Sequence, residues 1–301
     1  MLLATAAQAG TLNVRLVLSD SSPPYRQFAT SFIQALAVTK TDVDVTESQD
    51  VSGANIDLIV TVGMKAAELA RTQVSAPVLA AMVAKRSYDD MLAQSSPAKS
   101  AQAISAIYLD QPWDRQLDFW QATLPKRHRI GLLYSPNTRI DIARLRQDIA
   151  KRGGTLAAQA VRSSESLFSS LADVLNGSDV LIATPDSAIY SNSNIRNILL
   201  TSYRRGIPLI GLSQPYVNAG ALCAIFSTPE QLAVQASATV SLFARTRRLP
   251  DAQYPTAFTI ASNQQVGRSL GIVVPSQDAI RSQMSRMPAS RMPASRMPEE
   301  K

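Results

Sequence analysis

Residues 56–67 read IDLIVTVGMKAA, and this stretch decides the fold. Ile56–Val62 is a near-continuous run of apolar residues, which is typical of a strand buried on both faces of a parallel sheet. Gly63 then supplies the flexible residue of a tight turn, and Lys65–Arg71 has the composition of a helix. A buried strand that passes through glycine into a helix predicts an α/β fold.

The same order of strand, turn and helix occurs twice along the chain. Six predicted strands carry the pattern, namely Leu12–Leu18, Ile56–Val62 and Pro77–Met82 in the first half, and Arg129–Tyr134, Asp179–Thr184 and Ile207–Leu212 in the second. Each is followed by a polar, glycine or proline turn and then by a helical pattern. We therefore expect two Rossmann-like lobes with parallel sheets, and a functional cleft between them.

The end of the first repeat and the start of the second predict the domain boundaries. The first lobe is expected over residues 11–124 and the second over residues 125–226. Ordered-looking sequence continues after a predicted strand at Ala221–Phe226, so residues 227–280 are expected to return to the first lobe. Several hinge crossovers would then join the lobes, and a monomer is expected.

Both ends of the chain are expected to lie outside the lobes. Residues 1–10 (MLLATAAQAG) are small and apolar, and Ala7-Gln8-Ala9 fits a signal-peptidase site, so this segment is interpreted as the remnant of a signal peptide. A frayed apolar N-terminus is the alternative. The repeated Ser-Arg-Met-Pro-Ala sequence within residues 281–301 predicts a disordered tail, because its prolines block a helix. Export to a bacterial periplasm is the expected localisation.

Composition excludes several classes of protein. The 301-residue chain is 46% hydrophobic and 18% charged, and no apolar run approaches the ~20 residues of a membrane span. Cys223 and His128 are the only residues of their types, so an intrachain disulfide and multi-histidine or cysteine metal sites are excluded, and no cofactor is expected. The formal charge of +7 comes from dispersed arginines without a basic, aromatic-rich stripe, which argues against nucleic-acid binding.

Parallel sheets bind ligands beyond the carboxyl ends of their strands, where loops and helix N-termini supply hydrogen-bond donors. The predicted ligand-binding residues lie in these loops: Ser21, Ser22, Tyr25, Gly63, Met64, Lys65 and Asp110 in the first lobe, and Tyr134, Ser135, Asn137, Asp186, Ser187, Gln214 and Tyr216 in the second. They suit a small polar ligand, with Lys65 for a carboxylate, Asp186 for an ammonium and tyrosines for stacking. No catalytic or metal-ligating residue is expected.

Several of these residues have a purely structural alternative. Ser21 and Ser22 precede prolines and are typical helix caps, and Asp186 follows Pro185 as an ordinary N-cap would. Gly63 is explained equally well by a tight turn alone. Lys65 in the first turn of a helix is unfavourable beside the helix dipole, which favours an anionic partner for it.

Four segments of the chain resemble a bacterial family of ABC-transporter substrate-binding proteins. The segments are residues 57–78 (DLIVTVGMKAA and then APV), 129–136 (RIGLLYSP), 207–222 (IP and then GAL) and 270–275 (LGIVVP). The resemblance implies the type I periplasmic-binding-protein fold with three crossovers between its lobes, and some members of the family bind aromatic amino acids. The chain departs from the family's pattern at Met64, at Met82–Arg86 and at Ala103–Tyr108. The resemblance therefore implies the fold but not the identity of the ligand.

The leading hypothesis is a periplasmic solute-binding protein that captures an amino-acid-like molecule or another small carboxylate by hinge closure, for an ABC importer. The alternative is a ligand-gated sensor or adaptor for a membrane receptor or kinase, because the departures from the family leave the partner open. A membrane permease or receptor is the expected partner. An enzyme is not favoured, since no nucleotide-binding loop and no G-x-S-x-G motif is present.

Overall fold

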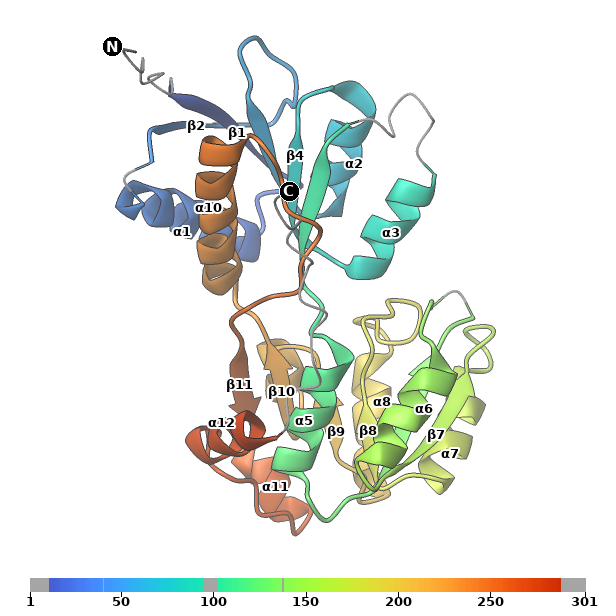
Figure 1. Cartoon of the computed structure of the whole chain (residues 1–301). Helices are drawn as coiled ribbons and strands as arrows, with labels where there is room; N and C mark the ends of the chain where they lie inside the picture. The colour runs from blue at the N-terminus through green and yellow to red at the C-terminus, as the bar shows by residue number, and fades with distance from the viewer. Residues whose placement is uncertain (1–10, 40, 95–101, 137, 288–301) are drawn as a thin grey trace, which may run out of the picture. The chain divides into compact units, whose positions relative to one another are not determined.

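The computed structural model describes residues 11–39, 41–94, 102–136 and 138–287 (Figure 1). The chain divides into two compact units. Unit 1 comprises residues 1–110 and 227–259, and unit 2 comprises residues 111–226 and 260–301. The chain therefore passes three times between the units, after Asp110, after Phe226 and after Thr259.

Unit 1 contains a five-stranded parallel sheet. Its strands are β1 (Leu12–Leu18), β2 (Val43–Ser48), β3 (Leu58–Val62), β4 (Val78–Val83) and β5 (Ile104–Tyr108). They are arranged in the order β2-β1-β3-β4-β5. The strand predicted at Leu12–Leu18 is confirmed with the same bounds, and the apolar runs around β3 and β4 are confirmed as strands one or two residues away from the predicted limits.

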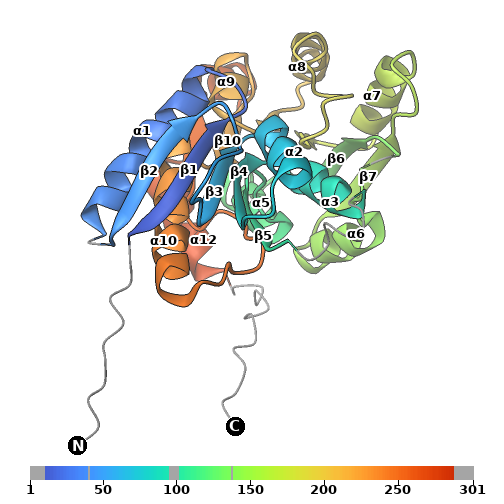
Figure 2. The same ribbon diagram turned by 90° about the horizontal axis from the view of Figure 1, so that it is seen from above.

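Helices cover both faces of this sheet, as Figures 1 and 2 show. They are α1 (Pro23–Val38) and α10 (Pro229–Thr246) on one face, and α2 (Met64–Gln73) and α3 (Lys85–Ala93) on the other. Side chains alternate along each strand, so Val60 packs toward α1 and α10 whereas Ile59 packs toward α2. The start of α10 was expected from the sequence and is confirmed. Thr228 is the N-cap, Pro229 is the first helical residue, and the side chains of Thr228 and Gln231 form a capping box.

Unit 2 repeats the arrangement with six strands. They are β6 (Arg129–Tyr134), β7 (Thr155–Ala160), β8 (Val180–Ile182), β9 (Leu209–Gly211), β10 (Cys223–Phe226) and β11 (Thr259–Ser262). The order is β11-β10-β9-β8-β6-β7. The pairs β6–β7, β6–β8, β8–β9 and β9–β10 are parallel.

The helices of unit 2 are α5 (Trp113–Thr123), α6 (Ile142–Lys151), α7 (Leu167–Asn176), α8 (Ile195–Arg204), α9 (Gln214–Asn218), α11 (Gln264–Ser269) and α12 (Gln277–Arg286). Apolar residues of α7 and α8 pack with Leu133, Leu181 and Leu209 of the sheet in one buried cluster. The apolar faces of α7 and α8 are therefore buried against the sheet.

The domain boundaries differ from those predicted. Helix α5 lies in unit 2, whereas the predicted first lobe ran to residue 124, and residues 260–287 belong to unit 2, whereas residues 227–280 were expected to return to the first lobe. The reason is packing, because α5 contacts α12 and α6. In addition, Arg152 at the end of α6 forms an ion pair with Asp118 of α5 at 2.9 Å.

The predicted C-terminal tail begins too early. Residues 281–286, expected to be disordered, form the last part of α12. The Ser276 side chain accepts a hydrogen bond from the amide of Ala279 at the start of this helix, and Ile280 is fully buried. The repeated prolines begin only at Pro288, so nothing blocks a helix before that residue. The predicted signal-peptide remnant (1–10) and residues 288–301 lie outside the described residues.

Candidate functional site

Both sheets have the same point at which the strand order reverses. In unit 1 the chain goes from β1 outward to β2 and then returns past β1 to β3, and in unit 2 it goes from β6 to β7 and returns to β8. The loops after β1 and β3, and those after β6 and β8, leave the sheet toward opposite faces. Open α/β sheets bind ligands at such switch points, outside the carboxyl ends of the strands. Each unit therefore has one candidate site.

At the switch point of unit 1, Gly63 is held against the loop that follows β1. Gly63 has a φ of +87°, and a Cβ added to it would lie 2.5 Å from the hydroxyl oxygen of Tyr25 and 2.7 Å from Oγ of Ser19. Ser19 Oγ also accepts a hydrogen bond from the amide of Ala66 at 2.9 Å. Burial raises the pKa of Tyr25, and the nearby Asp20 carboxylate raises it further. The glycine is thus needed for more than the turn, since it allows Tyr25 to approach the backbone.

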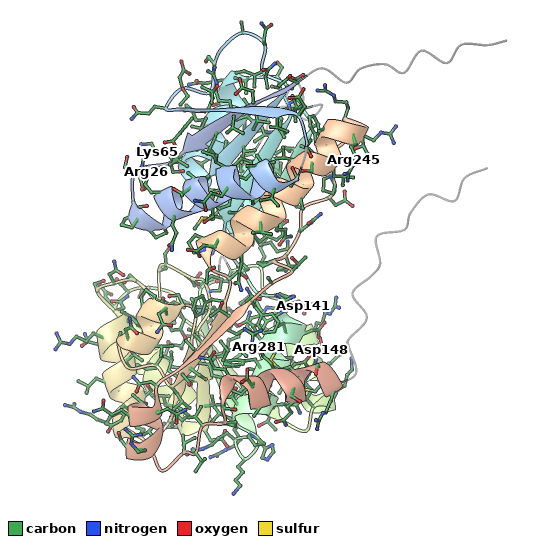
Figure 3. All side chains as sticks on the ribbon, turned by 90° about the vertical axis from the view of Figure 1, so that its left-hand side faces the viewer. Arg26, Lys65, Asp141, Asp148, Arg245 and Arg281 are labelled. Atoms are coloured by element: carbon green, nitrogen blue, oxygen red, sulfur yellow. The ribbon has the colours of Figure 1, made fainter. Side chains whose placement is uncertain are left out.

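A cavity of about 500 Å³ opens beside this contact, along the ends of β1 and β2 and the first turn of α2. Its polar lining consists of Ser19, Asp20, Ser21, Arg26, Glu47, Ser48, Gln49 and Lys65. Figure 3 shows Arg26 and Lys65 on the same side of unit 1. Two of the predicted ligand-binding residues, Ser21 and Lys65, therefore line one cavity, although no sequence motif connects them.

The cavity carries charges of both signs. Arg26 forms an ion pair with Glu47. Hydrogen bonds from Ser22 lower the pKa of Asp20, and the positive charge of Lys65 lowers it further, so the carboxylate is ionised at neutral pH. Lys65 is exposed and has an ordinary position in the first turn of α2. An ammonium and a carboxylate that line one hollow can together hold a zwitterion or a polar molecule.

The remaining predicted residues of unit 1 are more structural. Ser22 is the N-cap of α1, but its side chain makes no capping bond, and its amide instead donates to Asp20 at 2.8 Å. Met64 packs against a buried cluster around Tyr88 and Tyr108. Neither side chain lines the cavity, and their roles as ligand contacts stay predictions.

A second polar group lies at the ends of β4 and β5. Asp110 Oδ2 accepts a hydrogen bond from the amide of Lys85 at 2.6 Å, and burial raises the pKa of Asp110. The Lys85 ammonium lies 5.6 Å from the ring centre of Tyr108. Tyr108 in turn makes an edge contact with Tyr254, with ring centres 5.3 Å apart. Only Asp110 was predicted, because α3 was missed and because Lys85 and Tyr254 come from segments distant in sequence.

The backbone next to this group is irregular. Met82 has a φ of +54°, which is uncommon for a residue other than glycine, and the pairing of β4 with β5 shifts register between Ala81 and Val83. Bulges of this kind occur next to binding sites, where they redirect the strand that follows. Here the bulge immediately precedes Lys85.

At the switch point of unit 2, Asp186 joins the loop after β8 to the loop after β6. Its Oδ2 accepts hydrogen bonds from the amide of Ser135 at 2.9 Å and from the hydroxyl of Thr138 at 2.6 Å. Its Oδ1 accepts from the amide of Ala188 at 3.1 Å. Burial raises the pKa of Asp186, but the bonds from Thr138, Ser135 and Ala188 outweigh it, so the net pKa is lowered.

The expectation that Asp186 caps the next helix is wrong. No α-helix follows directly, because α8 begins only at Ile195, and Asp186 is buried, with only 4% of the residue exposed. Three donors inside the unit already surround it. Asp186 therefore holds the two switch-point loops together, and it has little capacity left for a ligand ammonium.

The other predicted residues of unit 2 that the structure describes lie in the loops after β6 and β8 and on α9. Tyr134 is half-buried at the end of β6, Ser135 is buried, and Ser187 is exposed. Tyr216, half-buried on α9, donates from its hydroxyl to the carbonyl of Tyr190 at 3.1 Å. Gln214 is exposed at the start of the same helix and bonds to Asn218. Asn137 lies outside the described residues.

Within the described ranges, no group of three histidine, cysteine or acidic side chains is placed to hold a metal ion. The helices of those ranges include none long and apolar enough to cross a membrane.

Comparison with known sequences shows the family. Residues 31–247 match the family described as ABC transporter substrate binding protein, and this chain belongs to it. The family is one of solute-binding proteins rather than of enzymes; its members bind a small molecule, work with a transporter and are typically periplasmic. No curated protein sequence matches the chain.

Solved structures share the fold at low sequence identity. A conserved domain protein from Vibrio cholerae has 18% identity and a TM-score of 0.62, with 91% of this chain and 98% of that chain covered. An ABC domain from Streptococcus pneumonia in complex with L-Trp has 17% identity and a TM-score of 0.61, with 90% and 98% covered. The ligand-free, open structure of CD0873, a substrate-binding protein from Clostridium difficile, has 16% identity and a TM-score of 0.65, with 89% and 98% covered. The expected type I periplasmic-binding-protein fold is confirmed.

Proposed function

We propose that this protein captures a small polar ligand, amino-acid-like or another small carboxylate, with the switch-point loops of both units, and that it delivers the ligand to an ABC importer from the periplasm. The cavity of unit 1, with Lys65 and Asp20 on its lining, is the observation that carries the proposal. Lys65 would bind the ligand carboxylate, and Asp20 is available for an ammonium group. The L-Trp found in the pneumococcal structure is a ligand of the same chemical class.

In this proposal the three chain passages between the units act as the hinge. Ligand contacts that form only in the closed state shift the equilibrium toward it. Asp186 supports the process indirectly, because it fixes the loops on which Tyr134 and Ser187 are presented. We expect saturating ligand to lower the radius of gyration measured by X-ray scattering, and an unchanged radius would argue against closure.

A thermal-unfolding screen tests the ligand class. The panel consists of amino acids, small carboxylates without an amino group, and sugars. Ribose is included because one structural relative is described as a periplasmic ribose ABC transporter. A ligand at about 100 times its Kd stabilises the folded protein by about 2.7 kcal/mol, which gives a readily measured rise in Tm. We expect amino acids or carboxylates to raise Tm. Stabilisation by sugars alone would contradict the proposed ligand class.

Replacing Lys65 by glutamine tests the role of its charge. We expect the Kd of a carboxylate ligand, measured by titration calorimetry, to rise about tenfold, because one charge-assisted hydrogen bond of ~1.5 kcal/mol is lost. Lys151→Gln removes another exposed ammonium, at the end of α6, and should leave Kd unchanged. Equal Kd values for wild type and Lys65→Gln would remove Lys65 from the site.

A further inference from the structure

The two units differ sharply in charge. Unit 1 contains 11 Lys and Arg residues against 12 Asp and Glu residues, a formal charge of −1. Unit 2 contains 19 against 11, a formal charge of +8. The excess positive charge of the protein therefore lies in unit 2, although both units have the same order of strands at their switch points.

Much of this charge gathers at the edge of the unit 2 sheet where the parallel strands begin. Lys126, Arg127 and Arg129 lead into β6, and Arg204 and Arg205 lie at the end of α8, just before β9. Arg268 lies on α11, which follows β11. The end of β11 lies next to the start of β10, because the amide of Asn263 donates to the carbonyl of Leu222, and Arg268 is therefore near the same edge. We call these six residues the basic edge.

The basic edge is wide and open to solvent. Strands β10, β9, β8 and β6 are consecutive in the sheet, so the six residues extend over three strand spacings, roughly 15 Å. Five of the six are exposed and Arg127 is half-buried. A hollow beside Arg127 and His128 measures only about 160 Å³. The arrangement is that of a broad surface and not of a pocket for a small anion.

Little negative charge offsets the basic edge. The carboxylate of Asp179, just before β8, accepts hydrogen bonds from the amides of His128 and Arg129 and from the Arg129 guanidinium. Arg205 donates to Asn176 and to the carbonyl of Ala172, which holds its charge in place without neutralising it. Within the described residues, Lys126, Arg204 and Arg268 form no ion pair.

The fold itself does not require positive charge at this edge. In unit 1 the strands that correspond to β6 and β9 are β1 and β4, and the residues directly before them, Thr11 and Pro77, are uncharged. Asp57, directly before β3, corresponds to Asp179 before β8, and it accepts hydrogen bonds from the amide of Asn13 and from the guanidinium of Arg247. Because the unit 1 sheet forms without a cation directly before the corresponding strands, the arginines and lysine of unit 2 need a different explanation.

We propose that the basic edge binds the anionic surface of a phospholipid bilayer. Lipid phosphates present negative charge over a broad area, which matches a spread of cationic side chains better than a single bound anion does. Tyr203, beside Arg204, is an exposed aromatic ring, but one tyrosine does not provide the series of stacking platforms of single-strand nucleic-acid sites. Association with the membrane would keep the protein near the transporter with which its family works, and it does not depend on the identity of the ligand.

Co-sedimentation of the full chain with vesicles tests this inference. One set of vesicles contains equal parts of phosphatidylglycerol and phosphatidylcholine, and the other contains phosphatidylcholine alone. We expect binding to the first set only, and we expect it to disappear between about 0.1 M and about 1 M salt, where the Debye length falls from about 10 to about 3 Å. Absence of binding to the anionic vesicles, or equal binding to both sets, would overturn the proposal.

A matched pair of triple variants locates the surface. Lys126→Gln, Arg204→Gln and Arg268→Gln together remove three charges of the basic edge, and we expect at least a tenfold loss in the apparent vesicle-binding constant. Arg86→Gln, Arg245→Gln and Arg248→Gln remove three charges from unit 1 and should change this constant less than twofold; Arg245 is labelled on α10 in Figure 3. Equal losses in both variants would show that only net charge matters and would contradict a specific surface.

Discussion

Replacing Gly63 by alanine is expected to destabilise unit 1 by about 3 kcal/mol and to abolish ligand binding. Gly63 has φ +87° and ψ 166°, a conformation found essentially only in glycine, which costs another residue about 1–3 kcal/mol. The new methyl group would also overlap Tyr25 and Ser19, and overpacking costs a further ~1–3 kcal/mol. A drop in Tm of roughly 10 °C by calorimetry would match this sum.

Gly153→Ala provides the control for Gly63→Ala. Gly153 also has a positive φ, +78°, but nothing lies within 4 Å of an added Cβ. Its replacement should therefore cost only the backbone strain, about 1 kcal/mol. If both variants lose the same stability, the contact of Tyr25 with Gly63 is unimportant, and that feature of the candidate site would be refuted.

Replacing Asp186 by alanine is expected to cost about 3 kcal/mol in the free energy of unfolding of unit 2. The change leaves the buried amide of Ser135 and the hydroxyl of Thr138 without their acceptor, and hydrogen bonds to a charged group contribute about 1.5–3 kcal/mol each. Denaturant unfolding at neutral pH measures the loss. Asp173→Ala, at an exposed acidic residue of α7, should change stability by less than about 0.5 kcal/mol.

The same aspartate predicts a dependence on pH. The pKa of Asp186 is lowered in the folded protein, so its stabilising contribution is complete above the unfolded value of about 3.9 and is lost as pH falls through the folded pKa. Asp186→Asn lacks this titration. We therefore expect the stability difference between wild type and Asp186→Asn to shrink on acidification below about pH 4. A constant difference across this range would mean that the carboxylate is not held in ionised form.

The strands could be predicted from the sequence because their physics is local. A strand buried on both faces needs a continuous apolar run, and Leu58–Val62 and Arg129–Tyr134 show such runs directly. Once strands and helices alternate, the carboxyl ends of the strands are known, which is why Ser21 and Lys65 of the unit 1 cavity can be predicted from the sequence.

The partners of the site residues could not be predicted because they are distant in sequence. Asp186 holds Ser135 and Thr138 from the loop of another strand, and no spacing rule connects positions about fifty residues apart. The position of Asp186 directly after Pro185 is also typical of a helix N-cap, so the sequence alone suggested that structural role instead. The Tyr108–Tyr254 contact has the same character, since the second ring arrives only when the chain returns to unit 1 after β10.

Titration calorimetry of the strongest ligand from the thermal screen tests whether both units bind one and the same molecule. If loops of both units touch the same molecule, as proposed, we expect one ligand per chain and a Kd that rises about tenfold both in Lys65→Gln of unit 1 and in Tyr134→Leu of unit 2. A ligand whose Kd changes in only one of these variants, or a stoichiometry of two, would contradict a single site shared by the two units.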